Sequence, residues 1–157
     1  MGALDVIFRL LKPGDEIIAG NDLYGGSNRL LTYLKTHNGI ITHHVSTTEP
    51  STLLPFLTSP TSNVAMVLLE TPTNPLLQIA DIAAISALVH QHRPDAIVVV
   101  DNTMMSPYLQ RPLEHGADLV YDSGTKYLSG HHDLMAGVIS CNREDIAKVR
   151  PLILHSS

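Results

Sequence analysis

Polar residues follow several apolar runs of this sequence directly. Asp101 comes after the run "AIVVV" (96–100), and Lys126 comes shortly after the run "ADLVY" (117–121). If both runs are central parallel strands, their carboxyl ends meet at one edge of a sheet, so the acid and the amine reach the same crevice. The spacing therefore predicts one site that contains both side chains.

A carboxylate and a reactive lysine are the two protein groups that pyridoxal phosphate (PLP) chemistry requires. The lysine forms a Schiff base with the cofactor, and the acid keeps the pyridine nitrogen protonated. Ser123 and Thr125 flank Lys126 with hydroxyls that can bind a phosphate, and Tyr24, in the Gly-rich loop after "EIIAG", can lay its ring on the cofactor. Ordinary interpretations also exist. Asp101 would suit a helix cap, Lys126 a solvated lysine in a turn, and Tyr24 a turn residue beside two glycines. Spacing alone leaves both interpretations open.

Nine histidines raise the alternative of a metal site. Neither adjacent pair, His43–His44 or His131–His132, can chelate one ion from a strand, because neighbouring side chains point to opposite faces. We interpret His131 and His132, which follow Lys126 closely, as residues that shape the pocket, and we expect no metal. A serine hydrolase is also disfavoured, because "YDSGT" lacks the first glycine of the G-x-S-x-G nucleophile turn.

Alternating helices and strands must position these residues. Asp81 is expected to cap a helix at its start, and Gly39 to end one. The alternation predicts an α/β fold, a three-layer sandwich in which helices cover both faces of a mostly parallel sheet. Apolar periodicity predicts helices over 3–11, 28–39, 49–57, 81–93, 107–116 and 143–150, and apolar runs predict strands over 16–20, 40–45, 63–70, 96–101, 117–122 and 136–141.

Composition restricts the functional classes. The 157 residues, 44 % hydrophobic and 16 % charged, suit one globular domain. A net charge of -5 without any run of Lys and Arg disfavours nucleic acid and anionic membranes as partners. No apolar stretch is long enough to span a membrane. Cys141 is the only cysteine, which fits a reducing compartment, and the first residues lack a secretory signal, so we expect a cytoplasmic protein.

Five motifs in one order resemble those of a known family. They are "DLYGGSNR", "ETPTNP", "VVVDNT", "SGTKY" and "LSGHHDLMAG", and the likeness runs from Met1 to about Arg150. Together they resemble the Cys/Met-metabolism PLP-dependent enzymes, and the stretch "GHHDLMAG" most resembles the fungal-type cystathionine β-lyases of that family. The resemblance implies that residues 1–150 form the central part of the PLP-binding large domain of a fold-type I PLP-dependent enzyme.

The resemblance implies catalytic roles for three residues. Lys126 is similar to the lysine that holds the cofactor, Asp101 to the partner of its ring nitrogen, and Tyr24 to the ring that stacks on it and helps to move protons. The implied reaction cleaves a carbon–sulfur bond of cystathionine to give homocysteine, pyruvate and ammonia in methionine biosynthesis, with Lys126 removing the Cα proton. These residues do not distinguish β- from γ-elimination, so a cystathionine γ-lyase or γ-synthase stays an alternative.

Five further positions match residues that bind the cofactor in this family. Ser123 and Thr125 match phosphate ligands, and Asn74 matches a residue near the cofactor's phenolic oxygen and the substrate carboxylate. Met1 and Gly2 match a phosphate-binding turn at the start of a helix, where backbone N–H groups hold anions.

The resemblance also implies that this chain is a piece of a longer enzyme. The family's N-terminal arm and C-terminal domain have no counterpart in it, and the tail 151–157, "PLILHSS", departs from the family pattern. Full-length members form homo-oligomers of the tetramer type, and a lone piece would expose the apolar faces that such interfaces bury. A catalytically inert fragment is therefore a second alternative, and a small α/β ligand-binding module without PLP is a third.

Overall fold

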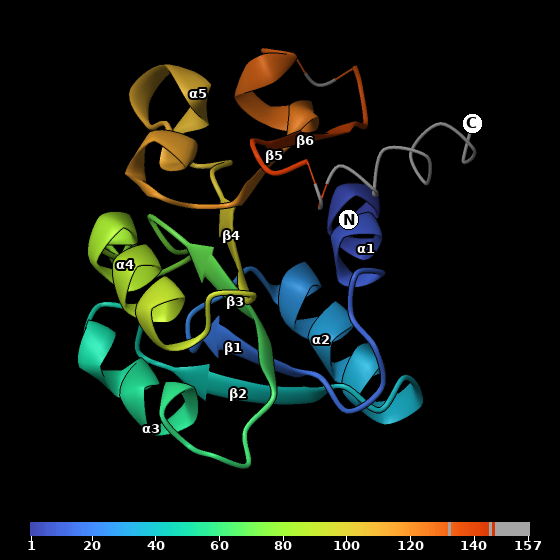
Figure 1. Cartoon of the computed structure of the whole chain (residues 1–157). Helices are drawn as coiled ribbons and strands as arrows, with labels where there is room; N and C mark the ends of the chain where they lie inside the picture. Colours follow the sequence, from blue (N-terminus) through green and yellow to red (C-terminus); the bar gives the residue numbers. More distant parts are fainter. Residues whose placement is uncertain (132, 145, 147–157) are drawn as a thin grey trace.

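A sheet of six strands forms the centre of the molecule (Figure 1). The computed structural model describes residues 1–131, 133–144 and 146. Within them the elements follow the chain as α1 (Gly2–Phe8), β1 (Glu16–Gly20), α2 (Gly25–His37), β2 (Ile41–Val45), η1 (Pro50–Leu53), α3 (Leu54–Leu57), β3 (Val64–Glu70), α4 (Ile82–His92), β4 (Ile97–Asp101), α5 (Ser106–Leu109), η2 (Pro112–His115), β5 (Leu119–Ser123), η3 (Gly124–Leu128) and β6 (Gly137–Cys141).

The strands lie in the order β2-β1-β3-β4-β5-β6. The first five are parallel to one another, and β6 runs antiparallel to β5 at the edge. The chain passes from β1 outward to β2 and then crosses back to β3 on the other side of β1. This reversal makes the gap between β1 and β3 a topological switch point, where open α/β sheets bind their ligands.

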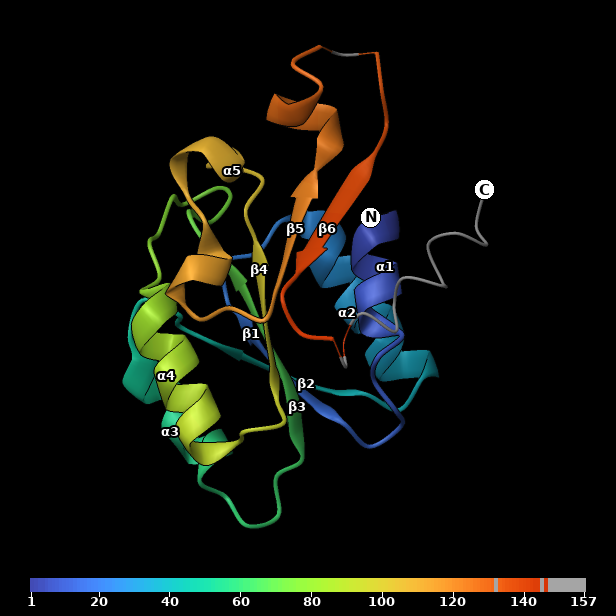
Figure 2. The same ribbon diagram turned by 45° about the horizontal axis from the view of Figure 1, so that its top comes forward.

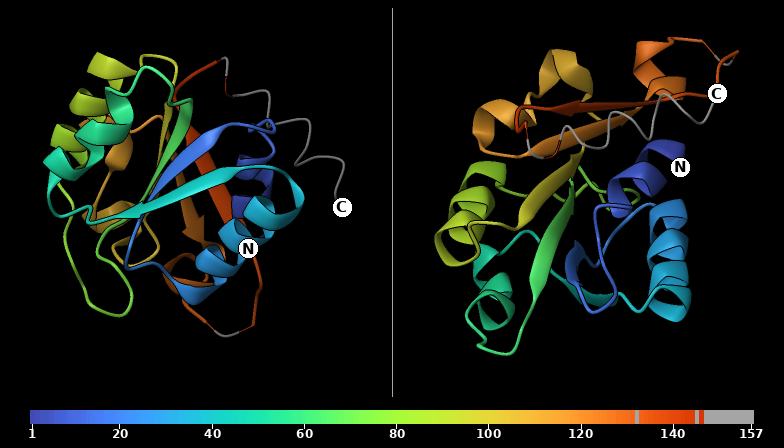
Figure 3. Two further views of the ribbon diagram at one scale, coloured as in Figure 1. Left: turned by 90° about the horizontal axis from the view of Figure 1, so that it is seen from below. Right: turned by 45° about the vertical axis from the view of Figure 1, so that its right-hand side comes forward.

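Helices cover both faces of the sheet (Figures 2 and 3). Helices α1 and α2 lie on one face, and α3 and α4 lie on the other. Successive strand residues alternate between these layers, so that Val99 packs in the α1–α2 core while Val98 and Val100 pack in the α3–α4 core. Burial on both faces explains why the central strands are continuously apolar. The predicted three-layer α/β sandwich is confirmed.

The predicted helix boundaries at Asp81 and Gly39 are also confirmed. The Asp81 side chain accepts a hydrogen bond from the N–H of Ala84 at 2.9 Å and caps α4. Gly39 follows the last residues of α2 with a φ of 66°, the left-handed conformation that ends helices. None of the helices in the described part of the chain is long and apolar enough to cross a membrane.

The helix predicted over 107–116 is wrong. The chain forms two short turns there, α5 and η2, which are separated by Gln110 and Arg111 in non-helical conformations. Pro112 is the cause, because its ring clashes with a helical conformation of the preceding residue, and Arg111 accordingly has a ψ of 81°.

Two other predicted helices differ from the prediction or cannot be compared with it. The segment 49–57 begins as a 3-10 turn over Pro50–Leu53 and becomes α-helical only from Leu54. The helix predicted over 143–150 and the tail 151–157 fall mostly or wholly outside the described residues.

Candidate functional site

Two buried carboxylates mark the candidate site at the carboxyl edge of the sheet. Glu70 ends β3 and Asp101 ends β4, and the two residues are partners in the parallel ladder. Both side chains face α1 and α2, since Leu68 and Val99, two residues earlier, pack in that core. Glu70 is 4 % exposed and Asp101 is 8 % exposed, so the two acids lie side by side with little water around them.

The Glu70 carboxylate connects two of the predicted site residues. The N–H of Tyr24 donates a hydrogen bond to Glu70 Oε2 at 2.8 Å, across the switch point between β1 and β3. The backbone amide of Asn74 also donates to this carboxylate. Burial raises the pKa of Glu70 to about 7, although the Tyr24 hydrogen bond opposes the rise and the charge of Asp101 adds to it. Glu70 is therefore partly protonated at neutral pH.

The Tyr24 side chain lies against the start of α2. Tyr24 is the residue that precedes this helix, and its side chain is about half exposed. A Cβ at Gly26 would stand 2.5 Å from Tyr24 Cε1 and 2.9 Å from Met1 Sδ. Both side chains thus occupy the space that any residue larger than glycine would need. Gly26 thereby brings Tyr24 and Met1, two predicted site residues, next to each other.

Thr103 joins Asp101 to the segment that carries Lys126. Its N–H and its hydroxyl donate to Asp101 Oδ1 at 3.0 and 2.5 Å. Its Oγ1 also accepts a hydrogen bond from the N–H of Ser123 at 2.9 Å. Ser123 is the last residue of β5 and leads into the turn with Lys126. The predicted proximity of the acid and the lysine segment thus has a direct structural link.

Lys126 stands in a π-helical turn over Gly124–Leu128 and is exposed. Its φ of -94° and ψ of -120° depart from helical values. Within the described residues, no acid forms an ion pair with it. The hydroxyl of Thr125 accepts a hydrogen bond from the N–H of Ala136 at 3.2 Å, whereas the Ser123 hydroxyl makes no hydrogen bond in the described part of the chain.

The start of α1 lies beside the same segment. Gly2 is the first residue of this helix. A Cβ at Gly137 would stand 2.7 Å from the Cβ of Ala3, and Gly137 is the ladder partner of Ser123 in β5–β6. The start of α1 therefore packs against the β6 residue that pairs with Ser123, while the phosphate-binding role of Met1 and Gly2 stays a prediction.

The histidines that the structure describes do not gather around one partner. His131 is exposed and, within the described part of the chain, makes hydrogen bonds with Ser129 alone. His132 lies outside the described residues. His43 and His44 contact different groups on β1. Among the residues that the structure describes, no group of three or more His, Cys, Asp or Glu is placed to hold a metal ion. The pocket-shaping role predicted for His131 and His132 stays a prediction.

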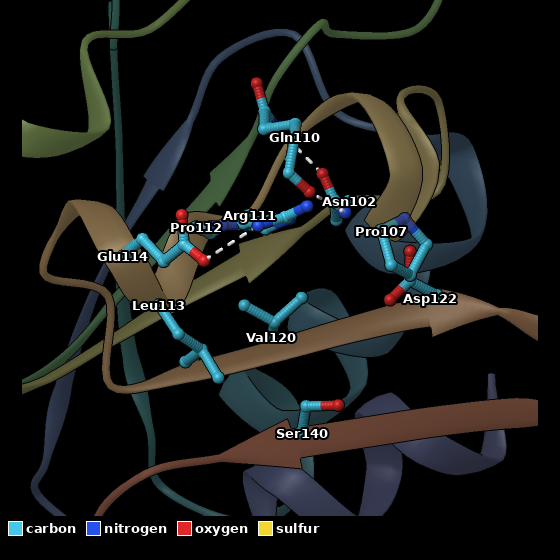
Figure 4. A pocket seen from close by; sticks show the side chains of 10 residues that line it. All are labelled: Asn102, Pro107, Gln110, Arg111, Pro112, Leu113, Glu114, Val120, Asp122 and Ser140. Carbon is cyan, nitrogen blue, oxygen red and sulfur yellow. Dashed lines mark hydrogen bonds and ion pairs between the residues drawn. The ribbon is translucent and has the colours of Figure 1, made fainter.

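A cavity of about 330 Å³ lies beside the face of β5 that carries Val120 and Asp122, opposite to the face with the candidate site (Figure 4). Asp122 and Val120 point into it, whereas Lys126 and Tyr24 do not line it. Burial raises the pKa of Asp122 to about 6, with a further contribution from the charge of Asp101. The cavity is lined by Asn102, Pro107, Gln110, Arg111, Pro112, Leu113, Glu114, Val120, Asp122 and Ser140.

The residues that sequence reasoning missed are Thr103 and Glu70. Both belong to the polar groups that follow predicted strands, in "VVVDNT" and "ETPTNP", so their positions were a usable signal. Their roles depend on which strands become neighbours and in which register. That information is tertiary and is absent from a local motif.

The architecture is that of fold-type I PLP-dependent enzymes, as solved structures of this kind match it closely. The structure of MetB from Corynebacterium glutamicum superposes with a TM-score of 0.87 at 40 % identity and covers 98 % of this chain and 39 % of that chain. A cystathionine γ-lyase from Lactobacillus plantarum, complexed with L-serine, gives a TM-score of 0.88 at 38 % identity, over 97 % of this chain and 40 % of that chain.

The chain belongs to the Cys/Met metabolism PLP-dependent enzymes, whose family pattern matches residues 1–154. It is 61 % identical over 146 residues to the cystathionine beta-lyase of Neurospora crassa, covering 93 % of this chain and 31 % of that protein. It is 47 % identical over 148 residues to the cystathionine beta-lyase of Schizosaccharomyces pombe, covering 94 % and 37 %. The chain thus spans about a third of the length of these curated relatives. The predicted family is confirmed.

The residues of the candidate site fit PLP. An exposed amine on Lys126, a buried carboxylate on Asp101 and an unengaged hydroxyl on Ser123 are suited to the aldehyde, ring nitrogen and phosphate of that cofactor. The ring of Tyr24, half exposed above Gly26, offers an aromatic face. This donor set agrees with the family, and it argues against a ligand-binding module that does not use PLP.

Proposed function

We propose that this chain carries the PLP-binding core of a carbon–sulfur lyase that cleaves cystathionine to homocysteine, pyruvate and ammonia in methionine biosynthesis. The observation that carries the proposal is the link from the buried Asp101 carboxylate, through Thr103, to the segment with Lys126. The β-lyase reaction is supported by the similarity to the Neurospora crassa cystathionine beta-lyase. The substrate class is accordingly a small sulfur amino acid.

Three residues would perform the chemistry. When bound, PLP supplies an aldehyde that condenses with amines and a protonated ring that withdraws electron density from the substrate's Cα. Lys126 would hold the cofactor through its Nζ and, once released by the substrate amine, take the proton from Cα. Asp101 would keep the proton on the ring nitrogen, and its burial strengthens that charged contact. Tyr24 would stack on the ring and assist proton transfer.

The remaining predicted residues would bind and orient. The free hydroxyl of Ser123 suits a phosphate contact better than that of Thr125, which is already engaged with Ala136. The backbone of Met1 and Gly2, at the start of α1, would complete the phosphate site. The backbone N–H of Asn74 donates to Glu70, which holds this residue in place. Asn74 would then orient the substrate carboxylate and the cofactor's phenolic oxygen.

We also propose that the whole protein works as a homo-oligomer. Large apolar side chains are exposed in and before β6: Leu134 is 51 % exposed, Met135 is 93 % and Val138 is 41 %. Such a surface at an open sheet edge suits coverage by further protein. The single cysteine supports a reducing compartment, for which we propose the cytoplasm, although two curated plant relatives are named chloroplastic.

The reaction is tested by identifying the α-keto acid that the protein releases from cystathionine in the presence of PLP. Pyruvate is the expected product, lost in Lys126→Ala and reduced at least about a hundredfold in Asp101→Ala, because the ring nitrogen loses its buried partner. Release of 2-oxobutyrate would instead assign the γ-lyase alternative. A chain that binds PLP and releases neither acid would be a catalytically inert core, which contradicts the lyase proposal.

A further inference from the structure

We propose that Thr103 is a positioning residue, whose hydroxyl fixes Asp101 and the segment carrying Lys126 at one mutual distance. The inference rests on the proposed PLP function, because the two groups must reach opposite ends of the same cofactor ring system. Thr103 itself would touch neither the cofactor nor the substrate.

The hydrogen-bond geometry gives this hydroxyl two simultaneous partners. Oγ1 donates its proton to Asp101 Oδ1 at 2.5 Å and accepts the N–H of Ser123 at 2.9 Å. A hydroxyl has one proton to donate and lone pairs to accept, so the two bonds do not compete. The backbone N–H of Thr103 adds a third bond to the same Oδ1 at 3.0 Å, which leaves the carboxylate little rotational freedom.

The position of Thr103 makes its side chain an extension of the sheet. Backbone pairing between β4 and β5 reaches Asp101 and Tyr121, and the N–H of Asn102 still donates to the carbonyl of Tyr121 at 3.0 Å. The β4–β5 ladder ends there, and the N–H of Ser123 donates to the Thr103 hydroxyl in place of a β4 backbone carbonyl. On the β4 side, the Thr103 side chain thus holds Ser123 where backbone pairing has ended, while β6 still pairs with Ser123 on the other side.

The loop that carries Thr103 is itself anchored. Asn102 is 1 % exposed, and its Nδ2 donates to the carbonyl of Gln110 at 3.0 Å. Gln110 Nε2 donates in return to Asn102 Oδ1 at 2.9 Å and to the carbonyl of Thr71 at 3.0 Å. Because the loop is held in place, the Thr103 hydroxyl can fix the positions of Asp101 and Ser123 relative to each other. On a mobile loop, the same hydroxyl would only satisfy the hydrogen-bonding groups around it.

Two substitutions separate the hydroxyl from the shape of the side chain. Thr103→Val keeps the shape and removes the hydroxyl, whereas Thr103→Ser keeps the hydroxyl and removes a methyl group. Thr58→Val is the matched control, because among the described residues the Thr58 hydroxyl donates to the carbonyl of Leu54 alone, in α3 on the other face of the sheet. If Thr103→Val does not fold, Thr103→Ala removes the same hydroxyl without adding an apolar branch.

Each variant is examined with and without PLP. Amide hydrogen exchange at Ser123, followed by NMR in the cofactor-free protein, should accelerate at least about tenfold in Thr103→Val and return to within about threefold of the starting protein in Thr103→Ser. The Kd for PLP should rise at least about tenfold in Thr103→Val, and the pH midpoint of the bound-cofactor absorbance should shift. Thr103→Ser and Thr58→Val should change neither quantity appreciably.

The outcomes distinguish this inference from the proposed function. A starting protein that binds no PLP contradicts the proposed function, while Ser123 exchange still decides whether Thr103 holds the segment. A protein that binds PLP equally well with valine at position 103 overturns the inference and leaves the proposed function intact. Faster exchange with unchanged PLP affinity and absorbance would show a purely structural hydroxyl and would overturn it as well.

Discussion

Replacing Glu70 with glutamine tests the electrostatics of the sheet edge. Burial raises the pKa of Glu70 from its ordinary 4.5 to about 7, so the folded protein binds a proton at this site more tightly than the unfolded chain does. That stabilisation is complete below about pH 4.5 and is lost as the pH rises through about 7. The difference corresponds to about 3 kcal/mol, at about 1.4 kcal/mol per pH unit. Because Glu70 is 4 % exposed, solvent screening reduces this figure little.

Glutamine does not titrate, so Glu70→Gln should remove this pH dependence. Its carbonyl can still accept the N–H of Tyr24, but one carboxylate hydrogen bond is weakened at a cost of about 1 kcal/mol. The variant should therefore be slightly less stable than the starting protein at pH 4.5 and about 2 kcal/mol more stable at pH 8. Urea unfolding followed by circular dichroism between these pH values measures the difference. Glu49→Gln, at an exposed position, is the control and should leave the curve unchanged.

The refuting result is equally specific. If the free energies of unfolding of Glu70→Gln and the starting protein run parallel across this pH range, within about 1 kcal/mol, Glu70 ionises in the folded state as it does in water. The inference that burial beside Asp101 raises the pKa of Glu70 would then be wrong.

Two further predictions concern the neighbouring strand end and the helix start. Burial raises the pKa of Asp122 from 3.8 to about 6, so the folded protein loses about 3 kcal/mol of stability as the pH rises through about 6. Asp122→Asn should remove this loss, which urea unfolding at pH 4 and pH 7.5 measures. If the variant loses as much stability between these pH values as the starting protein does, the prediction is contradicted. Gly26→Ala should leave stability within about 1 kcal/mol, since alanine favours a helix, but should weaken PLP binding about tenfold by displacing Tyr24 and Met1. Gly25→Ala, which has nothing within 4 Å of the added Cβ, should bind PLP normally, and equal affinities in the two variants would refute the packing argument.

The sheet was predictable because buried parallel strands leave a strong local pattern. A run such as Val98 to Val100 has to be apolar on both sides, and few other structures require that. The same logic predicted that Asp101 and Lys126 belong to one edge, because side chains that follow parallel strands share that edge. The link through Thr103 is consistent with this prediction.

The local connections were harder to predict where proline or tertiary register decided them. Apolar periodicity favoured one helix over 107–116, but the covalent geometry of Pro112 overrides periodicity at Arg111. The roles of Glu70 and Thr103 depend on strand pairing. Pairing of β1 with β3 brings Tyr24 beside Glu70. Pairing of β4 with β5 brings Ser123 beside Thr103. No motif in the sequence encodes these pairings by itself.

The most direct test of the account is the site at which PLP attaches to the protein. The chain is incubated with PLP, reduced with borohydride and digested, and the pyridoxyl mass is mapped by peptide sequencing. We expect a label on Lys126 that disappears in Lys126→Ala. The label should persist in Lys35→Ala, which removes an exposed lysine of α2. A label that is scattered over several lysines, or absent from a chain that circular dichroism shows to be folded, would contradict the proposed cofactor site.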